Sequence, residues 1–293
     1  MKNETMEIPA LLRRHGLRPR KSLGQNFLVD ESALQRVVAA AGLEADAVVL
    51  EIGPGLGSLT RLLAESARRV VCVELDPALI PVLHEVLAPF QNVQIVQGDI
   101  LRLDPSTYMK TASESALSPY LVVANIPYYI TSALMRHLLE GASRPQRMVL
   151  TVQREVAERI CAGPGDMSLL ALSVQLYGAP RLAGRIPANA FYPVPKVDSA
   201  IIRVDLLPER RLPAEQVETF FRLAKAGFSQ KRKTLRNALA AGMHWSALQS
   251  EAFLNQSGID PMRRAETLSL EEWGALVEVF RLAAHTSSPK DHQ

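Results

Sequence analysis

The stretch EIGPGLGSLT at residues 51–60 decides the fold of this chain. It follows the apolar run AVVLEI (47–52) and leads into SLTRLLAESA (58–67), whose apolar residues recur at helical spacing. Its three glycines allow a tight turn and let a ligand approach the backbone closely. The helix behind them offers unpaired N–H groups. The stretch therefore predicts a strand, a ligand-binding turn and a helix.

Further apolar runs continue this pattern along the chain, at 70–75, 93–97, 121–125 and 147–152. Helical stretches such as PALIPVLHEVL (77–87) lie between them. Continuous apolar strands are typical of a sheet covered on both faces, and strand–helix repetition predicts a parallel, doubly wound α/β sheet. After a helical stretch at 153–177, the segments 180–186 and 198–206 are expected to form a closing antiparallel pair.

A boundary is expected near LLPERRLP (206–213), which is rich in proline and charge. Beyond it four helices are expected, at 215–228, 231–242, 245–258 and 269–285. The Ser-rich stretch 111–119 is expected as a surface loop. The predicted layout is a flexible basic arm (1–25), an α/β domain (26–207), a helical domain (208–285) and a disordered tail (286–293).

Composition excludes several classes of protein. The 293 residues are 47% hydrophobic, which is enough for a large core and a second, smaller domain. No apolar stretch reaches the roughly 18 residues of a membrane span, and the first residues lack the apolar centre of a signal peptide. The Arg-rich segment 13–22 resembles a targeting peptide, but Glu4 and Glu7 argue against that reading. Cys72 and Cys161 have no metal-ligand spacing, so we expect buried free thiols, no metal site and a cytoplasmic location.

The net charge is only +3, yet basic residues cluster at 13–21 and in KRKTLR at 231–236. Such runs are usually solvated faces. Two runs that flank a candidate base pocket are better explained as phosphate contacts. We expect the second run to lie on a helix that presents Lys231, Arg232, Lys233 and Arg236 to RNA.

Acidic side chains follow the next two strands of the predicted sheet. Glu74 ends the second strand, where a carboxylate can accept hydrogen bonds from both ribose hydroxyls of a nucleoside cofactor. Asp99 follows the third strand, where it can meet the amine of the cofactor's adenine. The dinucleotide fingerprint G-x-G-x-x-G places its third glycine one position later than this chain does. With Gly53 and Gly55 in the loop, the set favours S-adenosylmethionine over NAD.

The fourth strand ends in Asn-Ile-Pro-Tyr at 125–128. The oxygen of Asn125 can accept from an amine, and Pro127 helps to aim nearby main-chain carbonyls. Tyr128 can stack on a base taken out of its helix. Taken alone, Asn-x-Pro is also common turn chemistry. Together with the acids at the preceding strand ends, it predicts methylation of the exocyclic amine of a base.

Several longer motifs carry a resemblance to one family. They are KSLGQNFL (21–28), EIGPGLGSLT (51–60), VELD (73–76), GDIL (98–101), NIPYYIT (125–131), FYPVPKVDSAIIR (191–203) and FSQKRKTLRNAL (228–239). Across nearly its whole length the chain resembles the KsgA-type rRNA adenine dimethyltransferases. The resemblance implies a seven-stranded Rossmann-like methyltransferase sheet with a small helical C-terminal domain. It also implies transfer of methyl groups from S-adenosylmethionine to two adjacent adenosines near the 3′ end of small-subunit (16S) rRNA, and a role in small-subunit biogenesis.

The resemblance also implies roles for single residues. The cofactor contacts are Asn26, Leu28, Gly53, Gly55, Glu74, Asp99 and Asn125. Leu28 is implied to act through its backbone, in an arm that closes over the cofactor, although residues 25–28 could equally cap a helix. Phe191 resembles a second aromatic of the base pocket, opposite Tyr128, or else it is a core aromatic of the final hairpin. Lys196 either contacts phosphate or is a solvated loop lysine.

The chain departs from the family pattern at three places. Residues 162–178 lack a Lys-x-Tyr-Gly that many relatives carry, Ile126 replaces a commoner leucine, and Tyr129 stands where asparagine is frequent. Enzymes that methylate large-subunit (23S) rRNA and confer macrolide resistance also use Asn-Ile-Pro, so that activity is an alternative. A mainly non-catalytic ribosome-assembly factor is another. The long basic segment favours the small-subunit substrate, and we expect a monomer because no exposed apolar helix demands a partner.

Overall fold

The computed structural model describes residues 6–109 and 119–286. Its contacts divide the chain into two compact units. The first unit consists of Met1–Glu158 and Ala179–Pro208, and the second of Arg159–Gly178 and Glu209–Gln293. Most of the expected Ser-rich loop at 111–119 and of the expected tail at 286–293 lies outside the described residues.

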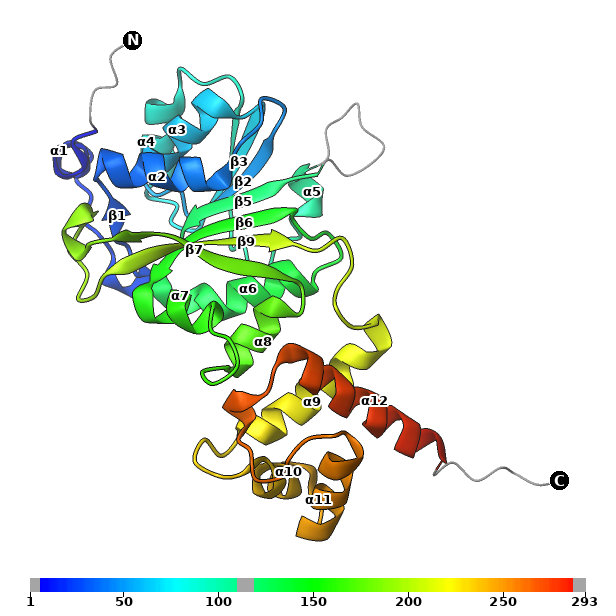
Figure 1. Cartoon of the computed structure of the whole chain (residues 1–293). Helices are drawn as coiled ribbons and strands as arrows, with labels where there is room; N and C mark the ends of the chain where they lie inside the picture. The colour runs from blue at the N-terminus through cyan, green and yellow to red at the C-terminus, as the bar shows by residue number, and fades with distance from the viewer. Residues whose placement is uncertain (1–5, 110–118, 287–293) are drawn as a thin grey trace. The chain divides into compact units, whose positions relative to one another are not determined.

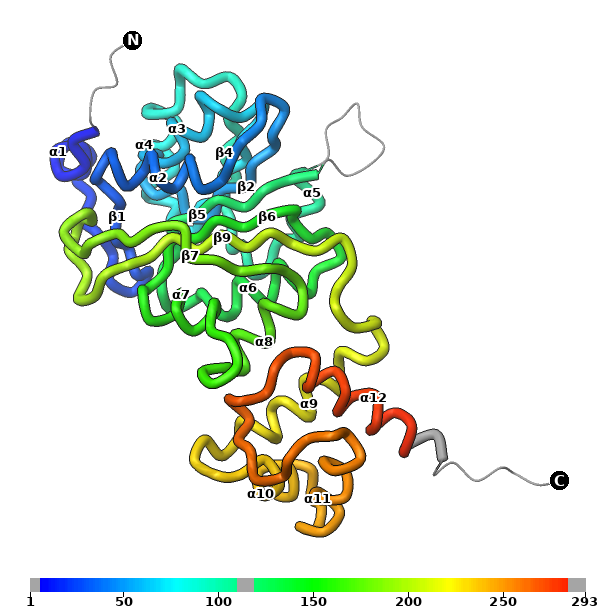
Figure 2. The backbone as a smooth tube through the Cα atoms, in the orientation of Figure 1, coloured from blue at the N-terminus to red at the C-terminus, as the bar shows by residue number. Residues whose placement is uncertain are grey.

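The first unit contains a seven-stranded sheet with the order β4-β3-β2-β5-β6-β9-β7 (Figures 1 and 2). The strands are β2 Val48–Ile52, β3 Arg69–Glu74, β4 Val93–Gln97, β5 Leu121–Asn125, β6 Arg147–Gln153, β7 Gly178–Ile186 and β9 Ser199–Leu206. The strands from β4 to β6 in this order are parallel, and β9 runs antiparallel to β6. The predicted α/β fold is confirmed, and the ends of β2 to β5 meet at one edge of the sheet.

Helices cover both faces of this sheet, which explains its continuous apolar strands. On one face lie α2 Glu31–Ala41, α3 Ser58–Ser66 and α4 Ile80–Leu87, and on the other lies α6 Thr131–Glu140 (Figure 1). Every residue of β2 is buried, whereas the edge strand β4 is only partly covered. A short helix, α5, spans Ser106–Met109. In the described part of the chain, no helix has the length and apolar content of a membrane span.

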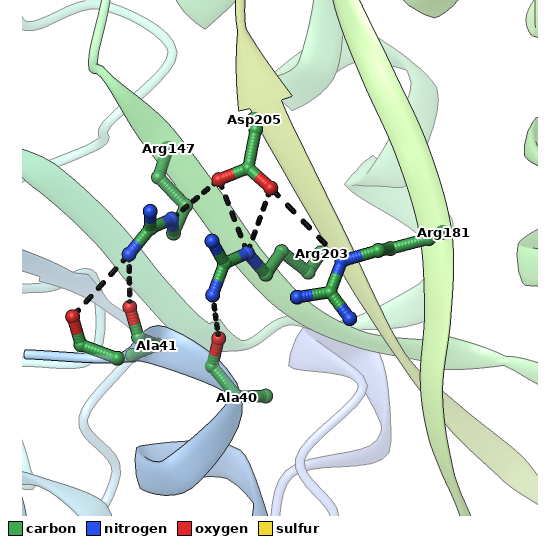
Figure 3. A network of polar contacts seen from close by, with 7 residues as sticks. Ala40, Ala41, Arg147, Arg181, Arg203 and Asp205 are labelled. Carbon is green, nitrogen blue, oxygen red and sulfur yellow. Dashed lines mark hydrogen bonds and ion pairs between the residues drawn. The ribbon is translucent and has the colours of Figure 1, made fainter.

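The C-terminal end of α2 is held to the sheet by a network of arginines (Figure 3). Arg147 donates from Nη1 to the carbonyl oxygen of Ala41 at 2.7 Å, and Arg203 donates to that of Ala40 at 3.2 Å. The carboxylate of Asp205 accepts from Nε of both arginines, at 2.5 and 2.8 Å. Partial burial alone would raise the pKa of Asp205, but the hydrogen bonds from these arginines outweigh it and hold the pKa below its usual value. The cations also face the negative end of the helix dipole.

The expected flexible arm is corrected by the structure. Residues Ile8–Arg14 form helix α1, and Ile8, Leu11 and Leu12 are buried against the first unit. Arg14 at the end of α1 pairs with Glu85 on α4. An apolar stripe on this short segment, rather than its charge, decides that it folds. A 3₁₀ turn (η1, Lys21–Leu23) follows, and then a two-residue strand β1, Phe27–Leu28, pairs antiparallel with β8, Phe191–Tyr192.

The second unit is helical, as expected. Its helices include α9 Val217–Phe228, α10 Leu235–Met243, α11 Ala247–Gln256 and α12 Leu270–Thr286, together with α8 Leu169–Gln175 from the earlier segment. The predicted helical stretch at 153–177 is two helices, α7 Arg154–Ile160 and α8. The fully buried Trp273 is a centre of packing, since its ring stacks on Phe228 at 5.7 Å. A side chain at Gly227 would come within 2.5 Å of that ring.

The predicted helix at 231–242 begins later than expected. Helix α10 starts at Leu235 after the N-cap residue Thr234, and Lys231, Arg232 and Lys233 lie in the preceding turn. The prediction that all four basic residues share one helix is therefore wrong. Only Arg236 of the four is helical.

Candidate active site

A cavity of about 220 Å³ lies in the first unit, at the sheet edge where the parallel strands end. Its wall includes every cofactor residue expected from the sequence, together with Pro127 and Tyr128. Those residues are Asn26, Leu28, Gly53, Gly55, Glu74, Asp99 and Asn125. The structure therefore brings together segments that are far apart in the sequence. Asn26 and Asn125, for example, are 99 positions apart.

The glycine loop has the backbone that its sequence demands. Gly53, Gly55 and Gly57 have φ values of +68°, +60° and +87°, in the left-handed region that favours glycine. A side chain at Gly53 would meet no atom within 4 Å, so this part of the loop faces open space. A side chain at Gly55 would come within 2.9 Å of the Phe27 ring. The loop therefore provides an open backbone cradle that fits a bound cofactor.

Glu74 lies at the end of β3 with only 6% of its surface exposed. Its Oε2 accepts from the backbone N–H of Gly55 at 3.1 Å, and its Oε1 accepts from that of Asp76 at 2.8 Å. Burial raises the pKa of Glu74, and the two backbone hydrogen bonds oppose that rise. Each carboxylate oxygen keeps a further lone pair that can accept from a ribose hydroxyl.

A second acid, Glu51, lies behind the cavity rather than in its wall. It is 1% exposed, and its Oε2 has no hydrogen-bond partner among the described residues. Burial raises the pKa of Glu51 to about 8, and the nearby Glu74 carboxylate adds to the rise. Glu51 is therefore largely protonated at neutral pH.

Residues 20–28, here called the strap, contribute residues 23–28 to the cavity wall and are fastened at two places. On one side Asp76, which is 2% exposed, accepts from Arg20 Nη1 and from Gln25 Nε2, both at 2.9 Å. On the other side the carbonyl oxygen of Asn26 accepts from Asn125 Nδ2 at 3.0 Å. The sequence indicated an arm over the cofactor, but nothing in it identified Arg20 and Asp76 as partners.

Tyr128 and Asp99 are also fixed by neighbours. The hydroxyl of Tyr128 lies 2.7 Å from Oγ of Ser199 on β9, which holds its ring at the cavity wall. Asp99 Oδ1 accepts from the backbone N–H of Leu101 at 3.0 Å, and its Oδ2 lies 3.5 Å from Arg102 Nε. The cavity wall also contains apolar residues that the sequence did not predict. They are Leu75, which follows Glu74, and Ile100 and Leu101, which follow Asp99.

Phe191 does not take the expected position. Its side chain is 2% exposed and packs in the core, where Phe191 pairs with Leu28 across β1 and β8. It is absent from the wall of the described cavity. Tyr128 and Phe191 therefore do not form an open pair of rings around a base in this structure. Phe191 is instead a core aromatic, which was the alternative expected from the sequence.

The candidate RNA-binding residues belong to the second unit and divide into two kinds. Lys231, Arg232 and Lys233 are exposed in the turn before α10. Arg236 is half-buried and donates from Nη1 to Glu251 at 3.0 Å, so its charge is already paired. Among the described residues, no group of His, Cys, Asp and Glu forms a metal site.

Comparison with known proteins agrees with this geometry. A family model described as ribosomal RNA adenine dimethylase matches residues 16–281. A relative from Dehalococcoides mccartyi named ribosomal RNA small subunit methyltransferase A is 46% identical over 264 residues, covering 90% of this chain and 89% of the relative. One of the same name from Alkaliphilus metalliredigens is 39% identical, covering 92% and 94%.

Two solved structures are also similar. The 23S rRNA methyltransferase ErmE is 29% identical with a TM-score of 0.68, covering 87% of this chain and all of its own. A dimethyladenosine transferase from Plasmodium falciparum shares the fold, with 23% identity and a TM-score of 0.74 over 88% of this chain and 98% of its own. The family match spans most of the chain and includes every residue of the described cavity wall. The chain therefore belongs to the ribosomal RNA adenine dimethylase family.

Proposed function

We propose that this protein transfers methyl groups from S-adenosylmethionine to the exocyclic amines of two adjacent adenosines near the 3′ end of small-subunit (16S) rRNA. The product is N6-dimethyladenosine, and the modification takes part in small-subunit biogenesis. The observation that supports this most is the position of Asn125 at the same cavity as Glu74 and Asp99. A cofactor site and a site for a base amine thereby share one sheet edge.

The donor set of the cavity fits the cofactor. Glu74 accepts from the ribose hydroxyls, Asp99 accepts from the adenine amine, and the open backbone at Gly53 receives the amino-acid end. The strap covers the site through Asn26 and Leu28. When bound, S-adenosylmethionine supplies a methyl group on a positively charged sulfur.

The residues of the base site act on the adenine amine, whose lone pair is delocalised into the ring. Asn125 Oδ1 and a main-chain carbonyl near Pro127 accept its two N–H groups. This favours a pyramidal nitrogen with a localised lone pair, so catalysis depends on alignment and fixed dipoles more than on a strong base. Tyr128 offsets the cost of unstacking the base, by about 1–3 kcal/mol for one stacking partner.

The second unit is proposed to bind the ribosomal substrate. Lys231, Arg232 and Lys233 are free to contact phosphates, whereas Arg236 supports the fold through Glu251. The proposed catalytic region at 26–207 and RNA-binding region at 208–285 correspond to the two units, except that residues 159–178 belong to the second unit. The proposed partners are the small ribosomal subunit and its rRNA, met in the cytoplasm by a monomer.

The small-subunit substrate is favoured over the large-subunit alternative by sequence similarity. Relatives named for the small subunit reach 46% and 39% identity, whereas the 23S enzyme shares 29%. The test is to incubate the protein and labelled S-adenosylmethionine with isolated, unmethylated small and large subunits, and to map dimethyladenosine in each rRNA. Two adjacent modified adenosines near the 3′ end of small-subunit rRNA are expected. Label in the large subunit alone would overturn the proposal. Subunit maturation without label would favour the assembly-factor alternative.

A further inference from the structure

Large apolar side chains are exposed on two segments, one in the cavity wall and one that pairs with the strap. Tyr129 belongs to the cavity wall, yet 61% of its surface is exposed. On a second segment, Tyr192, Val194 and Val197 are 38%, 63% and 46% exposed. Exposed apolar groups gathered at one place mark an interaction site. These four residues are called the mouth surface below.

The two segments of the mouth surface meet at the active site. Tyr128, the neighbour of Tyr129, lies with its hydroxyl 2.7 Å from Ser199, which follows the 192–198 loop. Tyr192 pairs with Phe27 of the strap. Tyr129 packs on Gly24 of the same strap. The two tyrosines therefore contact strap residues only three positions apart, and both belong to the first unit.

The ring of Tyr129 lies close to the strap at Gly24. Gly24 has a φ of +61°, and a side chain there would come within 3.1 Å of Cε1 of Tyr129. One edge of the ring therefore lies next to the strap, while most of the residue is open to solvent. A fixed aromatic ring with an exposed side loses little conformational freedom when a flat partner stacks on it.

The charges around the mouth surface suit a polyanion. Lys21 begins the 3₁₀ turn that leads to Gly24, and Lys196 lies between Val194 and Val197; both lysines are exposed. The carboxylate of the nearby Asp198 is already hydrogen-bonded within the protein, because its Oδ1 accepts from the backbone N–H of Ala188 at 3.0 Å. Aromatic rings interleaved with cations are the pattern by which proteins hold single-stranded nucleic acid. An apolar protein partner would leave both cations without a counter-charge.

We propose that Tyr129 stacks on the nucleotide next to the one whose base enters the cavity, and that Lys21 and Lys196 contact the flanking phosphates. Consecutive residues, Tyr128 and Tyr129, then carry consecutive bases. This inference rests on the proposed function, since it requires RNA at the mouth of the cavity. It makes Tyr129 a residue that positions the substrate strand.

The experiment measures kcat and KM of methyl transfer to unmethylated small subunits for the wild type, Tyr129→Leu and Tyr129→Phe. It also measures the Kd of S-adenosylmethionine for each. Loss of one stacked base should raise KM for the subunit roughly 5- to 100-fold in Tyr129→Leu, and Tyr129→Phe should restore most of the loss. The Kd of the cofactor should change far less than that KM. The matched control is Leu182→Ala, which truncates an exposed apolar side chain on β7 and should leave both values unchanged.

A KM for Tyr129→Leu within twofold of the wild type would overturn the inference while leaving the proposed function intact. A cofactor Kd that rises in parallel with KM would also overturn it, because Tyr129 would then act through the strap. Wild-type protein that transfers no methyl group to rRNA would end both proposals. A second measurement places 2-aminopurine beside the target adenosine in a short RNA, and quenching that depends on an aromatic at position 129 supports stacking.

Discussion

Asn125 donates a hydrogen bond from its side-chain nitrogen to the carbonyl oxygen of Asn26, across 3.0 Å. A carbonyl oxygen accepts and cannot donate, so this contact fixes which end of the Asn125 amide faces the strap. The amide oxygen is therefore the atom left for a base amine. One hydrogen bond thus closes the strap and orients the group proposed to act on the substrate.

Replacing Asn125 should separate chemistry from binding. Asn125→Ala removes the acceptor for the base amine, and the rate constant for methyl transfer should fall about 100-fold or more, the usual cost of losing one preorganised group. Single-turnover transfer to small subunits at saturating S-adenosylmethionine measures this rate. Calorimetry with S-adenosylmethionine measures the affinity separately, because the substitution also removes the hydrogen bond that fastens the strap, whereas Glu74 and Asp99 remain in the cavity wall. A transfer rate within threefold of the wild type would contradict the proposed role.

Replacing Glu74 should instead weaken the binding of the cofactor. In Glu74→Gln one amide nitrogen must face the N–H of Gly55 or of Asp76, which puts donor against donor. The Kd of S-adenosylmethionine should rise roughly 5- to 100-fold, the range for an unsatisfied buried polar group. Glu65→Gln on the exposed side of α3 provides the matched control. Equal affinities for the two variants would show that Glu74 does not hold the cofactor.

Glu51 should make stability fall as the pH rises. The pKa of this carboxyl is 4.5 in the unfolded chain and about 8 in the folded protein, so the folded state holds one extra proton between these values. The free energy of unfolding should therefore drop by on the order of 1 kcal/mol per pH unit across that window. Glu51→Gln removes this contribution, and its Tm relative to the wild type should increase steadily from pH 5 to pH 8. A difference in Tm that stays constant with pH would mean that Glu51 is ionised in the folded protein.

The contribution of Asp205 to stability should depend on pH in the opposite direction to that of Glu51. Its folded pKa lies below the ordinary value of 3.8, so its stabilising effect is present above that pH and is lost as the pH falls through the folded pKa. Asp205→Asn should lower the Tm at pH 7, because Arg147 and Arg203 lose their shared carboxylate. The gap should narrow in acid. Asp46→Asn, in an exposed turn, should have little effect at either pH.

The turn before α10 should set the salt dependence of substrate binding. Changing Lys231, Arg232 and Lys233 together to glutamine should reduce the slope of log K against log salt by about 2, if each residue contacts one phosphate. Binding of small subunits at several salt concentrations measures the slope. A triple variant that exchanges lysine for arginine, and arginine for lysine, keeps the charges and should keep the slope. An unchanged slope in the glutamine variant would show that the turn is only solvated.

Patterns local in sequence predicted most of the sheet and of the cavity wall. The runs at 93–97 and 121–125 coincide with β4 and β5 in their bounds, although β5 is buried at its centre and β4 is a partly covered edge strand. The glycine loop and the acids at strand ends were found because a parallel sheet brings those ends to one edge. That residues 25–28 lie at the cofactor site was predicted only from the family resemblance, and membership of the family is now confirmed.

Features that depend on tertiary contact were not predictable in the same way. Arg20 and Asp76 are 56 positions apart, and no local pattern links an exposed arginine to a buried acid. The burial of Phe191 follows from its pairing with Leu28, which only the fold reveals. The sequence pattern predicts a helix from 231, whereas the helix begins at Leu235 after the N-cap residue Thr234; lysine and arginine are good helix formers, so composition does not mark this boundary.

The second unit is formed by two separate segments of the chain, so a single truncation cannot remove it cleanly. A stop codon after Pro208 removes α9 but leaves α8 behind. In the intact protein α8 contacts α9, and its residues Leu172 and Val174 are buried, so the loss of α9 is expected to expose apolar surface on α8. Such a truncated enzyme is expected to aggregate, and a clean excision must delete residues 159–178 as well and rejoin the cut ends with a short linker.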